Sequence, residues 1–359
     1  MSNKYPLNSL FLYLTDRCNL RCSHCWISPQ FSDQHQDGIP IEPLKKAIRD
    51  AKNIGLQSVK LTGGEPLLYR EFDELLYFLA AEALSVNMET NGTLIDKERL
   101  AVFKKTGISQ ISVSFDAGSA DIHDAIRGVN GCFDRGVEGL EFLSDSGINL
   151  QVIMTLQHKN RAEIPAVMEL CKKYKISSLK INHLLPAGRA KNNFERGENL
   201  ELEELQTLYG RVAERRGAFR DLDIFFDLPV AFRTIDDITR SGACECAVLN
   251  ILGILSNGDI SICGIGQAYQ ELRMGNITRD SIPDVWRRHR ILKDLRRSLP
   301  ANLEGICRDC IFKFQCLGAC RANAYAVNRN LYAPYFLCQR LSDANGFPAS
   351  RRINTGSCP

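Results

Sequence analysis

Residues 14–25 read LTDRCNLRCSHC, and they place Cys18, Cys22 and Cys25 directly after the apolar run 9–15. A short apolar run of this kind is typical of a buried β-strand. Three thiolates in one loop leave one of the roughly four ligand sites of a zinc ion or a cubic iron–sulfur cluster unfilled. The spacing therefore predicts a metal centre with an open site. A structural zinc loop completed by His24 or by a distant residue is the alternative.

The composition is that of a globular protein. The chain has 359 residues, of which 44% are hydrophobic and 24% charged, enough for one large or two ordinary domains. A net charge of +3 is too balanced to predict a nucleic-acid or membrane surface. Residues 1–8 lack an apolar signal region, and no run reaches the roughly 18 apolar residues of a membrane span. We therefore expect a cytoplasmic protein whose fourteen cysteines bind metal more than they form disulfides.

The first half of the chain alternates between two patterns. Amphipathic stretches predict helices at 41–53, 70–83 and 163–174. Between such stretches, β-rich runs predict strands at 9–15, 58–62, 85–89, 110–115, 149–155 and 176–181. Six β–α units predict a parallel sheet, either curled into a partial barrel or left open. In both forms ligands bind at the carboxyl ends of the strands, which is where the first cysteine loop begins.

The second half has a different pattern. Residues 244–338 contain eight of the fourteen cysteines, and Asn257–Gly258 between two apolar runs predicts a hairpin. We expect an α/β chain that divides into a barrel (1–199), a helical connector (200–243), a small cysteine-rich α+β domain (244–345) and a tail (346–359).

A second motif, TGGEP at residues 62–66, follows the second predicted strand. Its glycines let backbone approach a ligand closely, and its carboxylate can accept hydrogen bonds from an ammonium group. Alone, a Gly–Gly turn is a weak signal. Together and at this spacing, LTDRCNLRCSHC and LTGGEPLL resemble the radical S-adenosylmethionine (SAM) superfamily.

This resemblance implies a partial (β/α)6 barrel in which Cys18, Cys22 and Cys25 hold a [4Fe-4S] cluster. The amino and carboxylate groups of SAM would bind the free iron, and Gly63, Gly64 and Glu65 would hold the ammonium group. Reduction would split SAM and give a 5′-deoxyadenosyl radical that abstracts hydrogen from a C–H bond. No further catalytic side chain is assigned.

Other segments match the same superfamily at the ends of predicted strands. Ser114 and Asp116 are expected near the ribose, Arg127 near the SAM carboxylate, and Gly188 in LLPAGRA near the adenine. His24 stands where an aromatic residue is common, and it is expected to contact the adenine through its backbone. Asn91, in the Asn91–Gly92 pair after the third strand, completes the expected SAM contacts. The alternatives are plain turns for Asn91 and Gly188, a helix cap for Ser114 and Asp116, and a surface ion pair for Arg127.

The C-terminal cysteines resemble the SPASM extension of certain radical SAM enzymes, which carries two auxiliary [4Fe-4S] clusters. By that resemblance, the ligands of one cluster are Cys244, Cys246, Cys263 and Cys320, and those of the other are Cys307, Cys310, Cys316 and Cys338. Cys244 is an extra, eighth ligand that the family commonly places further upstream; without it, one iron stays open. A zinc ribbon at 307–320 is the alternative. Cys132 and Cys171 are expected to be core thiols, and Cys358 a tail thiol.

Enzymes with a SPASM domain mostly modify peptides, so we expect an oxidoreductase that matures a ribosomal peptide by an oxidative cross-link. The chain also resembles maturases of the SynChlorMet-cassette type. Gly264 replaces the Asp of sulfatase maturases, which makes formylglycine formation less favoured. A radical SAM enzyme of small-molecule or cofactor biosynthesis and a non-catalytic zinc module are the alternatives. Expected partners are the peptide, a separate leader-binding protein if the barrel itself does not bind the leader, and an electron donor such as flavodoxin or ferredoxin. Neither nucleic acid nor membrane is expected, because the basic run 287–297 has the pattern of one helix face.

Overall fold

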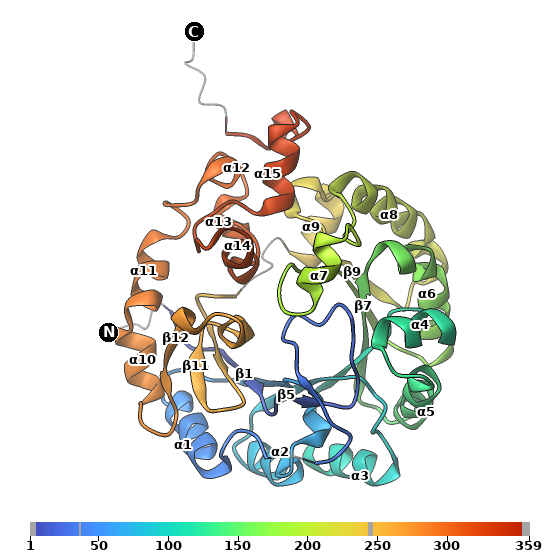
Figure 1. Ribbon diagram of the computed structural model, residues 1–359, viewed down its shortest axis with the longest axis vertical. Helices are drawn as coiled ribbons and strands as arrows, with labels where there is room; N and C mark the ends of the chain where they lie inside the picture. The colour runs from blue at the N-terminus through green and yellow to red at the C-terminus, as the bar shows by residue number, and fades with distance from the viewer. Residues whose placement is uncertain (1–4, 36, 243–246, 354–359) are drawn as a thin grey trace.

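The computed structural model describes residues 5–35, 37–242 and 247–353. The predicted ligands Cys244 and Cys246, and the tail thiol Cys358, lie outside these residues. One curved sheet of ten strands forms the centre, and helices cover its convex side (Figure 1). The strand order is β12-β11-β10-β1-β4-β5-β6-β7-β8-β9, parallel from β10 to β9, with β11 and β12 antiparallel at one edge. The expected α/β fold with a parallel-strand barrel is confirmed.

The strands of this sheet are β1 (Ser9–Tyr13), β4 (Ser58–Thr62), β5 (Ser85–Thr90), β6 (Gln110–Ser114), β7 (Asn149–Leu156), β8 (Ser178–His183), β9 (Asp223–Phe226), β10 (Ile251–Ile254), β11 (Asp259–Ser261) and β12 (Arg273–Asn276). Two short strands, β2 (Arg17–Cys18) and β3 (Gln30–Phe31), pair separately. The helices on the barrel are α1 (Ile41–Lys52), α2 (Phe72–Ala81), α3 (Lys97–Thr106), α4 (Ala120–Arg127), α5 (Cys132–Ser144), α6 (Ile164–Lys173), α7 (Ala190–Glu195), α8 (Leu202–Arg215) and α9 (Ile235–Ser241).

Alternation along the strands decides which side chains face the barrel interior. In β4, Val59 and Leu61 are buried in one apolar core with residues of the helices, whereas Lys60 and Thr62 point to the other, concave face and stay partly exposed. The same period of two residues runs through β5 and β8. The convex face of the sheet is therefore apolar and packed, and the concave face carries polar groups.

Six strands lie close to their predicted positions, with β8 shifted by two residues toward the C-terminus. Two further strands extend the parallel sheet at its two sides. β9 pairs with β8 at one edge, and β10, the first strand of the predicted hairpin, pairs with β1. The C-terminal region thus begins by extending the barrel sheet.

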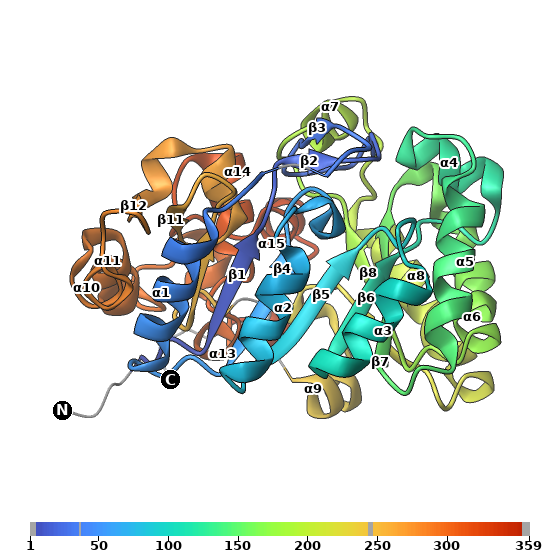
Figure 2. The same cartoon turned by 90° about the horizontal axis from the view of Figure 1, so that it is seen from below.

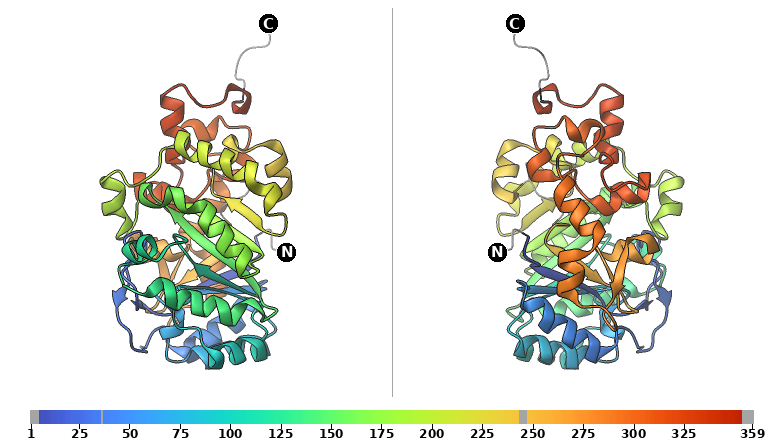
Figure 3. Two further views of the ribbon diagram at one scale, coloured as in Figure 1. Left: turned by 90° about the vertical axis from the view of Figure 1, so that its right-hand side faces the viewer. Right: turned by 90° about the vertical axis from the view of Figure 1, so that its left-hand side faces the viewer.

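The remaining helices form the C-terminal region: α10 (Ile282–Arg288), α11 (Arg290–Ser298), α12 (Gly305–Arg308), α13 (Lys313–Cys316), α14 (Arg321–Asn328) and α15 (Phe336–Asp343). They pack along one side of the barrel (Figure 3) and share its apolar core. Trp286 is fully buried in this core, and its Nε1 donates to the carbonyl of Tyr5 at 2.9 Å. In the basic segment, Leu292 and Leu295 are buried while Arg290 and Arg297 are exposed, as the helical pattern predicts. Among the described residues, no helix combines the length and apolar character that crossing a membrane requires.

Candidate active site

The three N-terminal cysteines lie in the loop between β1 and α1. Together with β2, β3 and α7, this loop covers the end of the barrel toward which the strands point (Figure 2). Cys18 and Cys22 are buried in a small apolar cluster with Leu20 and Cys132, and Cys25 packs against it. The sequence prediction of one cysteine loop at the carboxyl ends of the strands agrees with this placement.

The surroundings of these thiols fit a cationic cluster. Burial raises the pKa of the Cys22 thiol to about 11, and it raises that of Cys18 further, so a nearby positive charge is needed to stabilise the thiolates. Polar hydrogens already point at the sulfurs. The Leu20 amide donates to Cys18 Sγ at 3.4 Å, and Arg127 Nη1 donates to Cys22 Sγ at 3.8 Å. Within the described part of the chain, no three His, Cys, Asp or Glu side chains are grouped as ligands of a single metal ion.

The TGGEP segment lies against the cysteine loop through backbone. The amides of Gly64 and Glu65 donate to the carbonyls of Thr15 and Arg17 at 2.8 and 2.7 Å. A Cβ on Gly64 would lie 1.8 Å from the Arg17 carbonyl oxygen, and Gly63 has φ of +127°. Only glycine permits this approach at either position. The glycine pair thus joins the two motifs into one site.

Glu65 is a buried carboxylate at this junction. It is 1% exposed and accepts hydrogen bonds from Thr90 Oγ1 at 2.7 Å, from the Asn91 amide at 2.9 Å and from the Leu67 amide at 3.2 Å. Burial raises its pKa to about 7, although these hydrogen bonds oppose the shift. A ligand ammonium group would favour the ionised form, so the site fits the amino group of SAM.

A second buried charge network surrounds Asp116, which follows β6. Its Oδ2 lies 2.7 Å from Arg127 Nε and 2.6 Å from His24 Nε2, and its Oδ1 accepts from the Thr155 amide at 2.9 Å. Burial alone would raise the pKa of Asp116, but Arg127 and then His24 lower it well below its usual value. Arg127 is buried, so its ion pair is internal, not at the surface. The cap residue of α4 is Ser119, not Asp116 or Ser114.

The other predicted contacts also reach the cysteine loop or its rim. Asn91 Nδ2 donates to Asn19 Oδ1 at 2.8 Å and lies 4.0 Å from Cys18 Sγ. Gly188 has φ of +58°, and a Cβ there would lie 2.3 Å from the Trp26 carbonyl oxygen. Both positions thus do more than form turns. Ser114 ends β6 and is partly exposed. The side chain of His24 is held by Asp116, a role that sequence reasoning missed.

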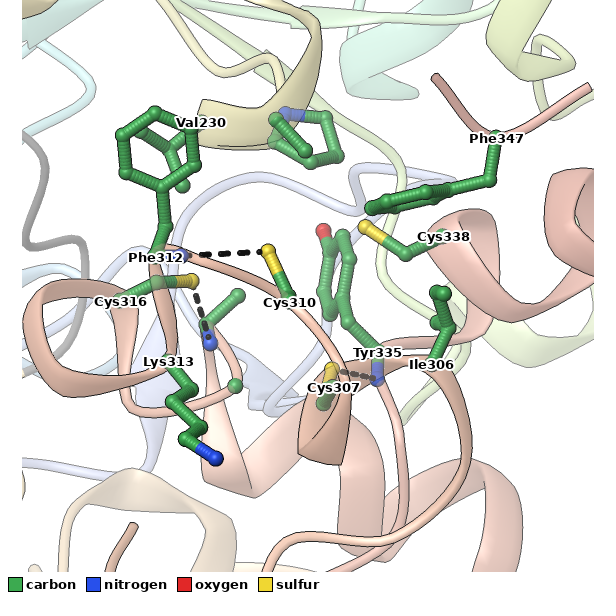
Figure 4. Close-up of a pocket in the computed structure, with 14 residues that line it drawn as sticks. Val230, Ile306, Cys307, Cys310, Phe312, Lys313, Cys316, Tyr335, Cys338 and Phe347 are labelled. Atoms are coloured by element: carbon green, nitrogen blue, oxygen red, sulfur yellow. Dashed lines mark hydrogen bonds between the residues drawn. The ribbon is translucent and has the colours of Figure 1, made fainter. Parts of the chain in front are cut away.

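A second set of thiols lines one pocket in the C-terminal region. Cys307, Cys310, Cys316 and Cys338, the four predicted ligands of one auxiliary cluster, surround it together with apolar side chains that include Phe312 and Phe347 (Figure 4). Backbone amides donate to three of these sulfurs: Phe312 to Cys310 at 3.4 Å, Ala319 to Cys316 at 3.1 Å and Tyr335 to Cys307 at 3.3 Å. Four thiols in mostly apolar surroundings fit an iron–sulfur cluster.

Two of the other predicted auxiliary ligands, Cys263 and Cys320, lie near Tyr13, which ends β1. Burial, and after it the charge of Cys263, raises the pKa of Tyr13, and Cys320 acts in the same direction. The ring of Tyr13 also packs edge-on against Trp26, next to Cys25, with ring centroids 6.2 Å apart. Tyr13 therefore lies between the N-terminal cysteine loop and the predicted auxiliary site. The sequence showed only an aromatic residue in a strand.

The barrel and the C-terminal region meet at a triad of His183, Asp227 and Tyr335. His183, which ends β8, lies 2.9 Å from Asp227 Oδ2 through Nδ1 and 2.6 Å from the Tyr335 hydroxyl through Nε2. Burial alone would lower the pKa of His183, but Asp227 raises it above its usual value. The same Tyr335 donates its amide to Cys307. Sequence reasoning missed this triad, because no local pattern joins residues this far apart.

Comparison with known proteins agrees with this fold. A radical SAM superfamily model matches residues 12–171, and a SPASM iron–sulfur cluster-binding model matches residues 244–311. The chain is therefore a radical SAM enzyme with a SPASM domain, and these domains imply SAM and iron–sulfur clusters, auxiliary clusters included, as its cofactors.

Several proteins with known names are similar to this chain over most of its length. The Fe-coproporphyrin III synthase of Methanosarcina barkeri is 27% identical over 93% of this chain and 88% of its own length. The mycofactocin maturase MftC of Mycolicibacterium smegmatis is 26% identical over 89% of this chain and 80% of its own length. SuiB of Streptococcus suis, whose structure was solved with its precursor peptide SuiA, shares the fold with a TM-score of 0.74 at 19% identity, over 93% of this chain and 76% of SuiB.

Proposed function

We propose that this enzyme modifies a ribosomally made peptide by an oxidative reaction, most simply a cross-link. When bound, SAM and its cluster supply a 5′-deoxyadenosyl radical that removes a hydrogen atom from a C–H bond of the substrate. In this proposal the ligands of that cluster are Cys18, Cys22 and Cys25. Gly63, Gly64, Glu65, Asn91, Ser114, Asp116, Arg127, Gly188 and the backbone of His24 bind and orient SAM.

The observation that carries the proposal is the position of the two auxiliary thiol sets against the barrel wall. Tyr13 connects the barrel to the set of Cys263 and Cys320, and His183 connects it to the pocket of Cys307 through Tyr335. A reaction that is oxidative overall needs an acceptor for the electron left on the substrate. Auxiliary clusters beside the barrel suit that need. The names of two relatives, the mycofactocin maturase MftC and the bacteriocin subtilosin biosynthesis protein AlbA, support a peptide substrate.

Formylglycine formation is disfavoured by the space around Gly264. A Cβ there would lie 2.3 to 2.5 Å from the ring and hydroxyl atoms of Tyr13. An Asp side chain at this position would therefore require Tyr13 to move. Because Tyr13 is buried between the N-terminal cysteine loop and the Cys263 segment, the geometry favours glycine at position 264. It therefore favours a reaction other than that of the sulfatase maturases.

The test uses the holoenzyme, purified and reduced without oxygen. It is incubated with SAM and the peptide encoded by the neighbouring open reading frame. We expect the peptide to lose the mass of two hydrogen atoms while 5′-deoxyadenosine forms. SAM cleavage with an unchanged peptide would contradict the peptide proposal.

A second candidate, side-chain chemistry on a tetrapyrrole, is supported by relatives that are named as heme and coproporphyrin synthases. Incubation of the same preparation with Fe-coproporphyrin III tests it. A mass change of the tetrapyrrole with no change of the peptide would favour this second candidate.

The proposal includes two protein partners. A flavodoxin or ferredoxin supplies electrons, and either a separate leader-binding protein or the barrel itself holds the leader of the peptide. The electron donor is tested by adding purified flavodoxin or ferredoxin and monitoring reduction of the clusters by their absorbance. A pull-down of the leader peptide with and without the candidate binding protein tests the second.

A further inference from the structure

The concave face of the barrel carries charged side chains next to the TGGEP segment. Lys60 lies two residues before Thr62. Glu89 lies directly before Thr90, whose hydroxyl donates a hydrogen bond to Glu65. Lys60 Nζ is 2.6 Å from Glu89 Oε1, and Thr62 Oγ1 donates to the other oxygen at 3.3 Å. The side chains of Lys60 and Glu89 remain 27% and 30% exposed. Both side chains are therefore partly accessible and not fully packed.

A third charge faces them from across the barrel. Lys180 lies on β8, three strands away from β5 in the curved sheet, and its Nζ is 5.9 Å from the centre of the Phe225 ring on β9. Burial alone would raise the pKa of Glu89, but Lys60 and also Lys180 hold it below its usual value. Glu89 and Lys180 both occupy partly exposed positions on the concave face of their strands, and the electrostatic effect agrees with a shared interior.

Glu89 and Asp227 in this interior each have a direct ion-pair partner, whereas among the described residues no carboxylate forms an ion pair with Lys180. Glu89 pairs with Lys60, and Asp227 pairs with His183. Across residues 5–35, 37–242 and 247–353, no carboxylate oxygen lies within the 4.0 Å ion-pair distance of Lys180 Nζ. Glu89 and Asp227 act on Lys180 only from beyond ion-pair distance, so within these ranges this partly buried ammonium group has no direct counter-ion to offset its lost hydration. A ligand anion would supply that contact.

The neutral polar groups deeper in the barrel do not compete for such a ligand. Gln110 Nε2 donates to Ser112 Oγ at 3.2 Å, Ser112 Oγ donates to Gln151 Oε1 at 3.1 Å, and Gln151 Nε2 donates to Ser178 Oγ at 3.0 Å. This ladder crosses from β6 to β8 and satisfies its own members. Lys180 stands next to it, two residues after Ser178 and toward the SAM end of the strand.

We propose that Lys180 binds a carboxylate of the substrate, so that the segment presented to the barrel carries an Asp, a Glu or another carboxylate near the reacting carbon. The Lys60–Glu89 pair forms the facing wall and offers one further charge of each sign. This inference rests on the proposed function for the identity of the substrate as a peptide. The recognised group, a carboxylate, would be the same on a tetrapyrrole.

Two probe pairs test the inference on the anaerobic holoenzyme with SAM bound. The first pair is the neighbouring-frame peptide and versions in which each Asp or Glu is replaced singly by Asn or Gln. The second is coproporphyrin III and its tetramethyl ester, which lacks the carboxylates. Binding is measured by fluorescence, and KM and kcat are measured for any probe that is turned over.

We expect Lys180→Met to weaken binding of the charged probe at least about tenfold, which equals about 1.4 kcal/mol. The neutral probe should bind wild type and variant alike, and Lys180→Arg should restore most of the affinity. Uncoupled formation of 5′-deoxyadenosine without substrate and the cluster absorbance should stay as in wild type. These two readouts also show that the variant has folded.

Lys104→Met is the matched control, because Lys104 is exposed on α3 outside the barrel. It should change none of these quantities. If only the porphyrin pair shows the Lys180-dependent preference, the carboxylate site stands and the peptide proposal fails. If neither pair shows it, or if Lys104→Met has the same effect, the inference is wrong.

Discussion

Glu65 has a raised pKa at the place where a SAM ammonium group is proposed to bind. Its folded-state pKa of about 7 lies above the ordinary value of 4.5, because burial disfavours the ionised carboxylate. The sign follows from linkage: between these two values the unfolded chain has lost the proton that the folded chain keeps. Glu65 alone thus lowers the free energy of unfolding as pH rises through this window, and above about pH 7 the penalty is constant.

A pH dependence of SAM binding follows from the same shift. Only ionised Glu65 can accept an ammonium group, so we expect SAM affinity to weaken about tenfold from about pH 8 to about pH 6. Anaerobic titration calorimetry measures it. The Glu65→Gln variant should bind SAM weakly, and its SAM affinity should depend little on pH in this range. Equal slopes for the variant and wild type would assign the titration to another group.

We predict that Cys22 binds a cluster and that Cys171 only fills the core. Three cubes of four irons predict about twelve irons per chain. We expect Cys22→Ala to reduce this to about eight and to abolish SAM cleavage. Cys171 is fully buried among apolar side chains, and Cys171→Ala should keep the full iron content. Iron and sulfide analysis of both variants is the measurement; equal iron loss would show that damage to folding, and not loss of a ligand, is the cause.

At the scale of elements, the contact between β4 and the cysteine loop depends on the absence of a side chain. Gly64→Ala would place its Cβ 1.8 Å from the Arg17 carbonyl oxygen, which is rigid backbone. We expect this variant to keep its helical circular dichroism while losing most of its SAM binding and at least one cluster. Full retention of SAM binding would mean that the loop can shift without cost.

A glycine in helix α8 provides the contrasting case. Gly210 lies in the interior of α8, and a Cβ there would meet no atom within 4 Å. Gly210→Ala should therefore raise the free energy of unfolding by about 0.5–1 kcal/mol, because alanine loses less backbone entropy in a helix. Denaturant unfolding measures it. A loss of stability would contradict the open space seen around Gly210.

At the scale of the whole molecule, the hydrogen bond between Tyr335 and His183 joins the barrel to the C-terminal region. Tyr335→Phe removes the hydroxyl and leaves His183 Nε2 without that partner in a buried position. We expect a loss of about 1–3 kcal/mol in the free energy of unfolding. Because β10 continues the barrel sheet and the core is shared, unfolding should remain a single transition.

Tyr77 is the control for this change. It is exposed on α2, so Tyr77→Phe should alter stability by less than about 0.5 kcal/mol. Two separate transitions in the Tyr335→Phe variant would show that the barrel and the C-terminal region fold independently. That result would contradict the shared core.

What the sequence alone determined is local. Six strand positions, the hairpin at Asn257–Gly258 and the cysteine spacings follow from periodicity and from residues close together in the chain. The same holds for the pairing of the first cysteine loop with TGGEP, because both come directly after strands and parallel strands end on the same side of the sheet.

The tertiary structure alone decided which distant groups meet. Strand β9 extends the parallel sheet beside β8, and strand β10 extends it beside β1. The Tyr335 hydroxyl contacts His183, and Lys180 faces Glu89 across the barrel. Curvature of the sheet and packing of the C-terminal helices bring these residues together. Such long-range geometry leaves no periodic trace in the chain, because each partner looks locally like an ordinary strand or loop residue.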